Sequence, residues 1–426
     1  MTYQEKPKSK YQPPKCEFCG HTAQQGADIV VSPNGKAICT DCAEKALVFS
    51  DADVPLLVAK AQKAKKPKLE GKRTTIPTPR EIVKILDEHV VGQAEVKKTL
   101  ATAVYNHYSR LKSLSSDNEG DELKDVTVEK SNIMMIGPTG CGKTLLAKTI
   151  AKILDVPFAI ADATTLTEAG YVGEDVENIV RYAYNNAGGN RERTEQALIW
   201  IDEVDKIASK TQNVSITRDV SGEGVQQALL KIIEGTICRF PPNGGRKHPD
   251  QQLVEIDTNN ILFICGGAFV GLDKIVEKRV KEESGASVIG FESDETKERK
   301  KANTENRIRP EDLVEYGLIP EFVGRIPIIS EMKELTEEDL VRVMVEPKNS
   351  ITKQYRKLLK QNQIELHYEE GALKALAQRA VERKTGARGL RAEMEEVMKD
   401  ILFEAPENKE PGKVITITEE MVKNVA

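Results

Sequence analysis

The sequence predicts an α/β fold in which a large parallel-sheet domain is followed by a smaller, mainly helical domain and preceded by a small cysteine-bearing module. Between residues 79 and 330, short apolar runs alternate with longer helical stretches, a pattern typical of parallel strands joined by crossover helices. Beyond residue 335 the periodicity is mostly helical, and two CxxC pairs lie near the N-terminus. Two or three folded units suit a chain of 426 residues, which is too long for one compact core.

The bulk composition is that of a soluble globular protein. Hydrophobic residues make up 39% and charged residues 30% of the chain, which argues against a disordered or a membrane protein. The longest apolar stretch, residues 261–272, is shorter than the roughly 18 residues of a membrane span, and the lysine-rich start lacks a signal-peptide core. We therefore expect the cytoplasm or an organelle matrix. The net charge of −5 argues against a protein that coats nucleic acid.

Shifts in composition predict the domain boundaries. The polar, proline-bearing start is typical of a flexible tail. A lysine-dense run at residues 59–73 is typical of a solvated tether, although such a run could also be a nuclear or nucleic-acid signal. The expected segments are the tail at 1–14, the cysteine module at 15–50, a linker at 51–78, the large domain at 79–330 and the small C-terminal domain at 331–426.

The apolar pattern places the individual elements. Strands of the large domain are expected at residues 132–136, 157–160, 197–201 and 260–265. Its helices are expected at residues 79–87, 95–112, 143–154, 175–185 and 224–234. In the small domain, the two strand candidates are residues 364–368 and 414–418.

A glycine-rich loop joins the strand at 132–136 to the helix at 143–154. It matches GxxxxGK[ST] in the strand–loop–helix context that phosphate binding requires. Glycines let successive backbone N–H groups face phosphate oxygens, and the helix adds its positive N-terminal end. Lys143 is expected to reach the β- and γ-phosphates, and Thr144 to bind Mg²⁺. The nucleotide-binding residues expected here are Gly137, Pro138, Thr139, Gly140, Cys141, Gly142, Lys143, Thr144 and Leu145.

Two acidic residues at the end of the strand 197–201 supply the hydrolytic chemistry that a binding loop lacks. Asp202 is expected to position Mg²⁺, and Glu203 to polarise the attacking water. Two acids after a strand also commonly cap a helix, but their place about sixty residues after a phosphate loop favours catalysis. The sequence therefore predicts an ATPase.

Four cysteines near the N-terminus have the spacing of a metal site. Cys16 and Cys19 form one CxxC pair, and Cys39 and Cys42 form a second after nineteen intervening residues. Four thiolates suit one tetrahedral Zn²⁺, which would hold together a module too small for its own core. Disulfides would need an oxidising compartment, for which the sequence gives no sign.

The phosphate loop, the acidic pair, the strand 260–265 and the separate helical C-terminal domain together resemble the AAA+ ATPases. The strand ends in Cys-Gly-Gly-Ala, without an obvious polar side chain for the family's sensor, so we assign no residue that role. Further motifs narrow the resemblance to the ClpX family of protein unfoldases, over nearly the whole chain from Cys16 onward. That resemblance implies a homo-hexameric ring whose zinc modules dimerise and receive adaptors and some substrate proteins. Zinc ribbons elsewhere often bind nucleic acid.

The resemblance also implies loops that line an axial pore for substrate polypeptides. The Gly-Tyr-Val-Gly segment at 170–173 matches a gripping loop with Tyr171 and Val172 at its tip, whereas its pattern alone would favour buried turn packing. A basic triplet matches the family's entrance loop, and a phosphate-contacting patch is its alternative. The other expected pore residues are Arg218, from a second loop at 215–224, and the triplet Arg246, Lys247 and His248.

An apolar tripeptide lies beside a strongly charged run. Ile289, Gly290 and Phe291 precede residues 292–309, which are too charged to form a core. From the pattern alone, the tripeptide could fold back onto its own domain. It matches the tripeptide with which ClpX-type rings dock onto the ClpP peptidase, so ClpP is the partner that the resemblance implies.

Two arginines and two valines complete the site that the resemblance implies. Arg325 matches the finger that enters a neighbouring subunit's site, and Arg388 matches a sensor that closes over its own subunit's nucleotide. A guanidinium suits both positions because it spreads positive charge over phosphoryl oxygens, although a lone arginine is more often part of a surface ion pair. Val90 and Val91 match the segment that packs against adenine.

The expected function is ATP-dependent unfolding of proteins and their translocation into ClpP. One alternative is a DNA-acting AAA+ ring motor, suggested by the cysteine module and the basic linker, although no DNA-reading helix is recognisable. Another is a nucleotide-gated binding scaffold that does not hydrolyse ATP, against which Glu203 and Arg325 argue.

One position departs from the family pattern. Cys141 stands where ClpX relatives commonly have serine. Nucleotide binding should survive, because this position offers its backbone N–H. A thiol beside the phosphates is predicted to react with alkylating reagents and to be protected by bound nucleotide.

Overall fold

The computed structural model describes two units of the chain, Met1–Lys72 and Arg73–Ala426. In the first unit, β1 (Ile29–Val31) pairs antiparallel with β2 (Ala37–Cys39). No helix in the described part of the chain is long and apolar enough to cross a membrane. The described residues are Cys16 and residues 29–31, 37–39, 76–114, 126, 128–167, 174–208, 222–242, 253–283, 307–383, 385–407, 410 and 412–424.

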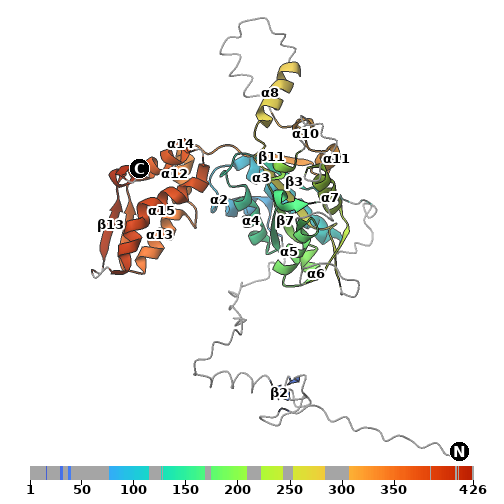
Figure 1. Cartoon of the computed structure of the whole chain (residues 1–426), viewed down its shortest axis with the longest axis horizontal. Coiled ribbons are helices and arrows are strands. Elements are labelled where there is room, and N and C mark those ends of the chain that lie inside the picture. The colour runs from blue at the N-terminus through green and yellow to red at the C-terminus, as the bar shows by residue number, and fades with distance from the viewer. Residues whose placement is uncertain are drawn as a thin grey trace, which may run out of the picture. The chain divides into compact units, whose positions relative to one another are not determined.

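In the second unit, the elements before the C-terminal helices pack on a five-stranded parallel sheet (Figure 1). Its strands lie in the order β11, β3, β10, β7, β4, and each neighbouring pair is parallel. All five strands therefore end at the same edge, where the residues beyond them can meet. The strands are β3 (Ile133–Ile136), β4 (Phe158–Asp162), β7 (Leu198–Asp202), β10 (Leu262–Gly267) and β11 (Ile328–Glu331).

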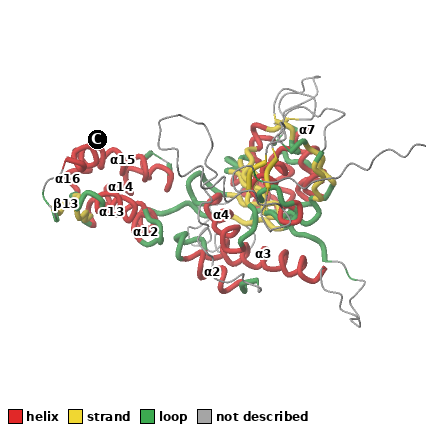
Figure 2. Tube along the Cα trace, turned by 90° about the horizontal axis from the view of Figure 1, so that it is seen from below, coloured by secondary structure: helices red, strands yellow, loops and turns green. Residues whose placement is uncertain are grey.

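Three helices cover one face of the sheet, and Figure 2 shows them together. They are α2 (Pro79–Asp87), α3 (Ala94–Leu114) and α4 (Lys143–Leu154). On β3, Ile133 and Met135 pack with these helices, whereas Met134 and Ile136 belong to the core on the other face. Burial on both faces explains why the three central strands β3, β10 and β7 are largely continuous apolar runs, the feature that predicted them.

The other face is covered by helices and a hairpin. These are α5 (Asn178–Asn186), α7 (Glu223–Glu234), α10 (Pro310–Tyr316), α11 (Pro320–Gly324), and the antiparallel strands β8 (Ile237–Phe240) and β9 (Val254–Asp257). The further elements of this part are α6 (Arg191–Thr194), α8 (Leu272–Glu283) and the short 3₁₀ helices η2 (Ala163–Thr165) and η3 (Val204–Ile207).

The C-terminal helices, orange and red in Figure 1, form a group with its own core. Leu340, Leu376 and Met394 are among its fully buried residues. The strand predicted at 364–368 is confirmed, and its parallel partner starts one residue earlier than expected. The elements are α12 (Glu337–Val345), α13 (Ile351–Lys360), β12 (Ile364–Tyr368), α14 (Glu370–Glu382), α15 (Gly386–Glu404), η5 (Ala405–Glu407), β13 (Lys413–Ile417) and α16 (Glu419–Asn424).

The structure confirms the predicted parallel sheet and the bounds of α2 and α4, and it corrects the start of α5 and adds strands that were not predicted. The helix expected from residue 175 begins at Asn178, because Glu174–Asp175 forms a short strand, β6, that pairs in parallel with β5 (Leu166–Thr167). The edge strand β11 was not predicted. It contributes four residues to the sheet beside β3.

Candidate ATP site

The phosphate loop leaves the C-terminal end of β3 and continues into α4. Gly140 and Gly142 have φ of 80° and 102°, which residues with a side chain rarely adopt. Lys143 Nζ donates to the carbonyl oxygens of Gly137 at 2.6 Å and Pro138 at 2.9 Å, so the ammonium group lies against the loop. The first turn of α4 carries no acidic residue. Backbone N–H groups, the helix end and the lysine therefore give this loop the chemistry of an anion site.

Thr144 and Asp202 lie side by side at the strand ends. The hydroxyl of Thr144 donates to Asp202 Oδ2 at 3.2 Å. Hydroxyl and carboxylate oxygens are ligands that Mg²⁺ accepts, usually together with substrate phosphates. The donor set that the structure brings together next to the loop therefore fits Mg²⁺.

The residue after Asp202 has a strained backbone. Glu203 is exposed, its φ is 56° and its ψ is 32°, and its N–H donates to Asp202 Oδ1 at 3.0 Å. Left-handed residues other than glycine are uncommon and cluster at functional sites. The two oxygens of Asp202 thus link the phosphate loop to the turn that carries Glu203.

A buried acid that the sequence did not single out fixes this turn. Asp205 is 6% exposed, and its Oδ1 accepts the N–H of Ala268 at 3.1 Å, just beyond the end of β10. It thereby ties the turn after β7 to the neighbouring strand end. Its only signal in the sequence is an acid among the apolar residues that come after the strand.

The start of α15 lies directly against the phosphate loop. The N–H of Ala387 donates to the carbonyl of Gly140 at 3.3 Å. A Cβ atom at Gly140 would lie 2.7 Å from the carbonyl oxygen of Thr385, so only glycine permits this approach. Arg388 is the next residue of the helix and is exposed. The structure therefore brings Arg388 close to the loop.

Val90 and Val91 lie in the turn between α2 and α3, also close to the loop. Both are buried, and a Cβ atom at Gly142 would lie 3.9 Å from Val90 Cγ1. The turn is held by Lys97, which is 2% exposed. Its Nζ lies 2.6 Å from both the carbonyl oxygen of Val90 and Asp87 Oδ1.

Arg325 is not brought to this site. Its carbonyl oxygen accepts from the side chain of Asn132 at 2.9 Å, and Asn132 directly precedes β3. Residues 132 to 137 of an extended strand span about 16 Å, so Arg325 lies at the opposite edge of the sheet from the phosphate loop. Its guanidinium pairs with Glu234 at 2.8 Å and is half exposed.

The structure corrects the expected reactivity of Cys141. The side chain is 3% exposed, and its Sγ lies 3.8 Å from Met332 Sδ. Burial raises the pKa of this thiol, and the nearby Lys143 only partly offsets that effect. The thiol faces the apolar core, and the position offers the loop its backbone alone.

A cleft of about 1030 Å³ flanks the loop on one side. It is lined by Gly137–Cys141 of the loop, by the start of α8, by residues 331–337 and by the end of α14. Lys143, Thr144 and Asp202 lie outside this lining. The cleft is therefore large enough to admit a ligand beside the loop, but it does not contain Thr144 and Asp202, the pair whose oxygens fit Mg²⁺.

Of the four cysteines predicted to bind zinc, Cys16 and Cys39 are described. Both are buried, and the N–H of Cys39 donates to Cys16 Sγ at 3.3 Å. Cys16 and Cys39, one from each CxxC pair, therefore lie next to each other. Among the described residues, no three His, Cys, Asp or Glu side chains form a group that could hold a metal. The predicted residues that lie outside the described ones are Cys19, Cys42, Tyr171, Val172, Arg218, Arg246, Lys247, His248, Ile289, Gly290 and Phe291.

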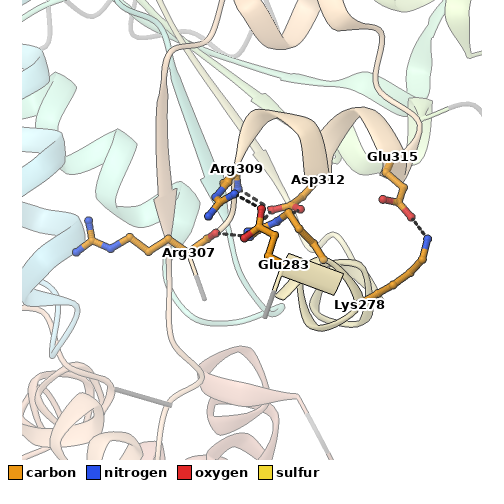
Figure 3. Close-up of polar contacts among 7 residues, drawn as sticks. Lys278, Glu283, Arg307, Arg309, Asp312 and Glu315 are labelled. Atoms are coloured by element: carbon orange, nitrogen blue, oxygen red, sulfur yellow. Dashed lines mark hydrogen bonds and ion pairs between the residues drawn. The ribbon is translucent and has the colours of Figure 1, made fainter. Parts of the chain in front are cut away.

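Ion pairs join the two elements that flank residues 284–306 (Figure 3). Arg279 of α8 pairs with Asp312 of α10 at 2.7 Å, and Asp312 is 1% exposed. Arg279 also donates to the carbonyl oxygen of Arg307 at 3.0 Å. The two ends of the segment that contains the apolar tripeptide are therefore fastened together. Further pairs join Lys278 to Glu315 and Glu283 to Arg309.

Comparison with known proteins agrees with this geometry. Residues 128–329 match the family described as "AAA domain (Cdc48 subfamily)", and residues 335–417 match the C-terminal, D2-small domain of ClpB protein. The chain is 51% identical over 411 residues to the ATP-dependent Clp protease ATP-binding subunit ClpX of Treponema denticola, which covers 96% of this chain and 94% of the relative. Proteins of the same name from Borrelia duttonii and Borrelia recurrentis are 48% identical and cover 96% of this chain and 91% of their own length. The chain therefore belongs to the ClpX family, and it is an AAA+ ATPase that couples ATP hydrolysis to protein unfolding.

Proposed function

We propose that the chain forms a homo-hexameric ring that unfolds proteins and threads them into a ClpP peptidase. The observation that carries this proposal is the similarity over 96% of the chain to proteins named as the ATP-binding subunit of the Clp protease. The proposed location is the cytoplasm, as is general in this family. An AAA+ ATPase uses ATP with Mg²⁺, and the residues described above fit both.

The chemistry at the loop arises from the groups it brings together. Lys143 would move from the loop carbonyls to the β- and γ-phosphates, where its positive charge counters theirs. Thr144 and Asp202 would hold Mg²⁺, which neutralises charge on the phosphates as it develops. Glu203 would orient the attacking water and accept its proton, which is supported by its strained turn beside Asp202.

Two arginines would complete the site. Arg388 would close over the nucleotide of its own subunit, which is supported by the contact between the start of α15 and Gly140. Arg325 would contact the phosphates bound by a neighbouring copy, because the phosphate loop of its own chain lies at the other end of the strands, beyond its reach. Each guanidinium would stabilise negative charge on the transferred phosphoryl group.

The loops that would handle protein substrates are proposed from the family resemblance. Tyr171 and Val172 would grip the polypeptide in the pore, with Arg218 and the triplet at 246–248 as further contacts. The tripeptide at 289–291 would dock onto ClpP, and the ion pairs at the base of its segment support a fixed attachment there. The proposed domains of this protein are the tail at 1–14, the cysteine module at 15–50, the linker at 51–78, the large domain at 79–330 and the small C-terminal domain at 331–426.

The N-terminal module is proposed to bind one Zn²⁺ through its four cysteines. The hydrogen bond from Cys39 N–H to Cys16 Sγ supports this, because a sulfur that accepts a backbone N–H is stabilised as the thiolate that binds metal. The module would receive adaptors and some substrates.

The test of the proposed function is unfolding of a tagged fluorescent protein by the full-length chain with ATP, with and without ClpP. We expect loss of fluorescence that needs ATP, and degradation only when ClpP is added. The Glu203→Gln chain should bind ATP but hydrolyse it about 10² to 10⁴ times more slowly and unfold nothing. ATP hydrolysis stimulated by DNA rather than by unfolded protein would favour a DNA-acting ring. Absence of phosphate release would favour a scaffold.

A further inference from the structure

Gln93, two residues beyond Val91, holds the connector between the sheet and the C-terminal helices. We define the connector as residues 332–336, which join β11 to α12. Gln93 Nε2 donates to the carbonyl oxygen of Lys333 at 2.7 Å, and Gln93 Oε1 accepts the N–H of Lys333 at 3.1 Å. A primary amide can donate and accept at once, so one side chain clamps both backbone groups of one connector residue.

The backbone at Gln93 is shaped for this clamp. Gly92 and Gln93 have φ of 68° and 58°. A left-handed conformation is easy for glycine but uncommon for glutamine, and it persists where the surroundings fix it. The Lys97 ammonium fixes the same turn from the other side through the carbonyl oxygen of Val90.

A second attachment fastens the start of this turn to the C-terminal helices. The carbonyl oxygen of Glu88 accepts the N–H of Lys348 at 2.8 Å, and the two side chains pair at 2.6 Å. Lys348 lies between α12 and α13. Val90 and Val91 therefore lie between two points at which the turn is bound, one to the connector and one to the C-terminal helices.

The connector also contacts the phosphate loop. The N–H of Met332 donates to the carbonyl of Ile136 at 2.7 Å, and a Cβ atom at Gly137 would lie 2.8 Å from Met332 Cβ. Gln93 therefore holds Lys333, while the last residue of β3, directly before the loop, holds Met332. Two adjacent connector residues therefore contact both the phosphate loop and the turn that carries Val90 and Val91, the two parts of the site proposed for ATP.

We propose that Gln93 is a positioning residue that couples the base of ATP to the connector. With adenine against Val90 and Val91, the turn is ordered, the clamp on Lys333 stays closed, and the connector holds the C-terminal helices so that Arg388 reaches the phosphates. The inference rests on the ATP site proposed above, and it adds that the base, and not the phosphates alone, sets the connector.

Hydrogen–deuterium exchange of the full-length chain tests this coupling. In the wild type, the slowly hydrolysed analogue ATPγS should slow exchange of the connector amides by about 5-fold or more, the lower range of allosteric couplings. Tripolyphosphate, which has no base, should protect the phosphate loop but leave the connector unchanged. In the Gln93→Ala chain, ATPγS should still protect the loop but no longer the connector, and kcat should fall by up to about 100-fold because Arg388 loses its position.

Matched variants separate the clamp from general loosening. Gln93→Glu keeps the size of the side chain but cannot donate to the carbonyl oxygen of Lys333, so it should also lose base-dependent protection. Gln354→Ala removes a glutamine whose bond, to the carbonyl oxygen of Asn349 at 2.9 Å, stays within the C-terminal region, and it should behave as the wild type.

Two results would overturn the proposal while leaving the ATP site intact. One is connector protection by ATPγS that persists in both Gln93 variants. The other is a wild-type connector that tripolyphosphate protects as strongly as ATPγS. A wild-type chain that neither hydrolyses ATP nor shows loop protection would instead overturn the proposed function, and this inference with it.

Discussion

At the scale of the residue, each oxygen of Asp202 has its own neighbour. One accepts the hydroxyl of Thr144 and the other accepts the N–H of Glu203. A single carboxylate therefore positions both the hydroxyl that is proposed to bind Mg²⁺ and the turn that carries the proposed base. Replacing it should disturb two steps at once, which is why Glu203 is the cleaner position for testing hydrolysis alone.

The structure predicts that the Cys141 thiol is unreactive, whereas its place in the phosphate loop had predicted a reactive thiol. Because burial raises its pKa, little thiolate forms near neutral pH, and the labelling rate should keep rising with pH beyond the usual thiol pKa of about 8.5. We expect iodoacetamide to label Cys141 much more slowly in the folded chain than in urea, as measured by peptide mass spectrometry. Equal rates in the folded and unfolded chain would contradict this burial.

His107 gives a prediction about acid stability. It is 3% exposed, and burial, with Arg110 and Lys130 nearby, lowers its pKa to about 3. The unfolded chain takes up this proton near pH 6.5 while the folded chain does not, so the stabilisation is complete above that pH and is lost as pH falls. Between pH 6.5 and 5 we expect the free energy of unfolding to fall by about 2 kcal/mol through this residue.

The measurement for His107 is denaturant unfolding followed by the fluorescence of Trp200, which is buried in the core beside α3. The His107→Gln chain can keep a donor toward the carbonyl oxygen of Asn260 and should show a flatter pH dependence over this range. An identical slope in both chains would show that other groups cause the acid loss.

The contrast between residues that the sequence revealed and those it did not has a physical basis. The phosphate loop and the acidic pair come directly after apolar strands, so local spacing predicted them. Gln93 and Asp205 act through partners 240 and 63 residues away, and nothing in the local pattern marks such a pairing. Local sequence patterns reveal sites whose residues are close together in the chain. Hydrogen bonds between residues far apart in the chain can be found only from the folded structure.

At the scale of the element, α14 and α15 are joined through one buried carboxylate. Glu393 is 1% exposed and pairs with Arg379 at 2.7 Å and with Arg383 at 2.5 Å, both on or next to α14. The turn between these helices is the part that touches Gly140. Glu393 therefore fastens α15 to the end of α14, next to the turn that contacts the phosphate loop.

Glu393→Ala should therefore weaken both stability and nucleotide affinity. It leaves two arginines without their shared partner, which should cost about 2–3 kcal/mol after allowance for the exposure of Arg383. We expect a lower denaturation midpoint of the C-terminal region and a higher KM for ATP. Lys374→Ala, which removes an exposed pair on the same helix, is the control and should change neither. If the two substitutions had equal effects, Glu393 would have no special role in joining α14 and α15.

The sequence predicted most elements because they are long or buried on both faces. β11 escaped prediction because it has four residues, only one of them buried, and lies at the edge of the sheet. The antiparallel strands β8 and β9 were missed for a similar reason, since only alternate residues of β8 are buried. Short, half-exposed strands carry too little apolar signal.

At the scale of the whole molecule, the residues proposed to hydrolyse ATP do not all meet within one chain. Lys143, Asp202 and the start of α15 converge at one edge of the sheet, while Arg325 lies at the other. If Arg325 acts on phosphates at all, it acts on those of another copy. The functional unit is then an assembly, and hydrolysis depends on the neighbour.

The most direct test of this central claim is ATP hydrolysis by co-expressed Arg325→Ala and Glu203→Gln chains. Each variant alone should bind ATP but hydrolyse it at least about 100-fold more slowly than the wild type. Mixed assemblies contain sites where an intact Glu203 faces an intact Arg325 from the next subunit. We predict that the mixture hydrolyses ATP well above either variant alone. A mixture no faster than the two variants averaged would contradict a site shared between copies.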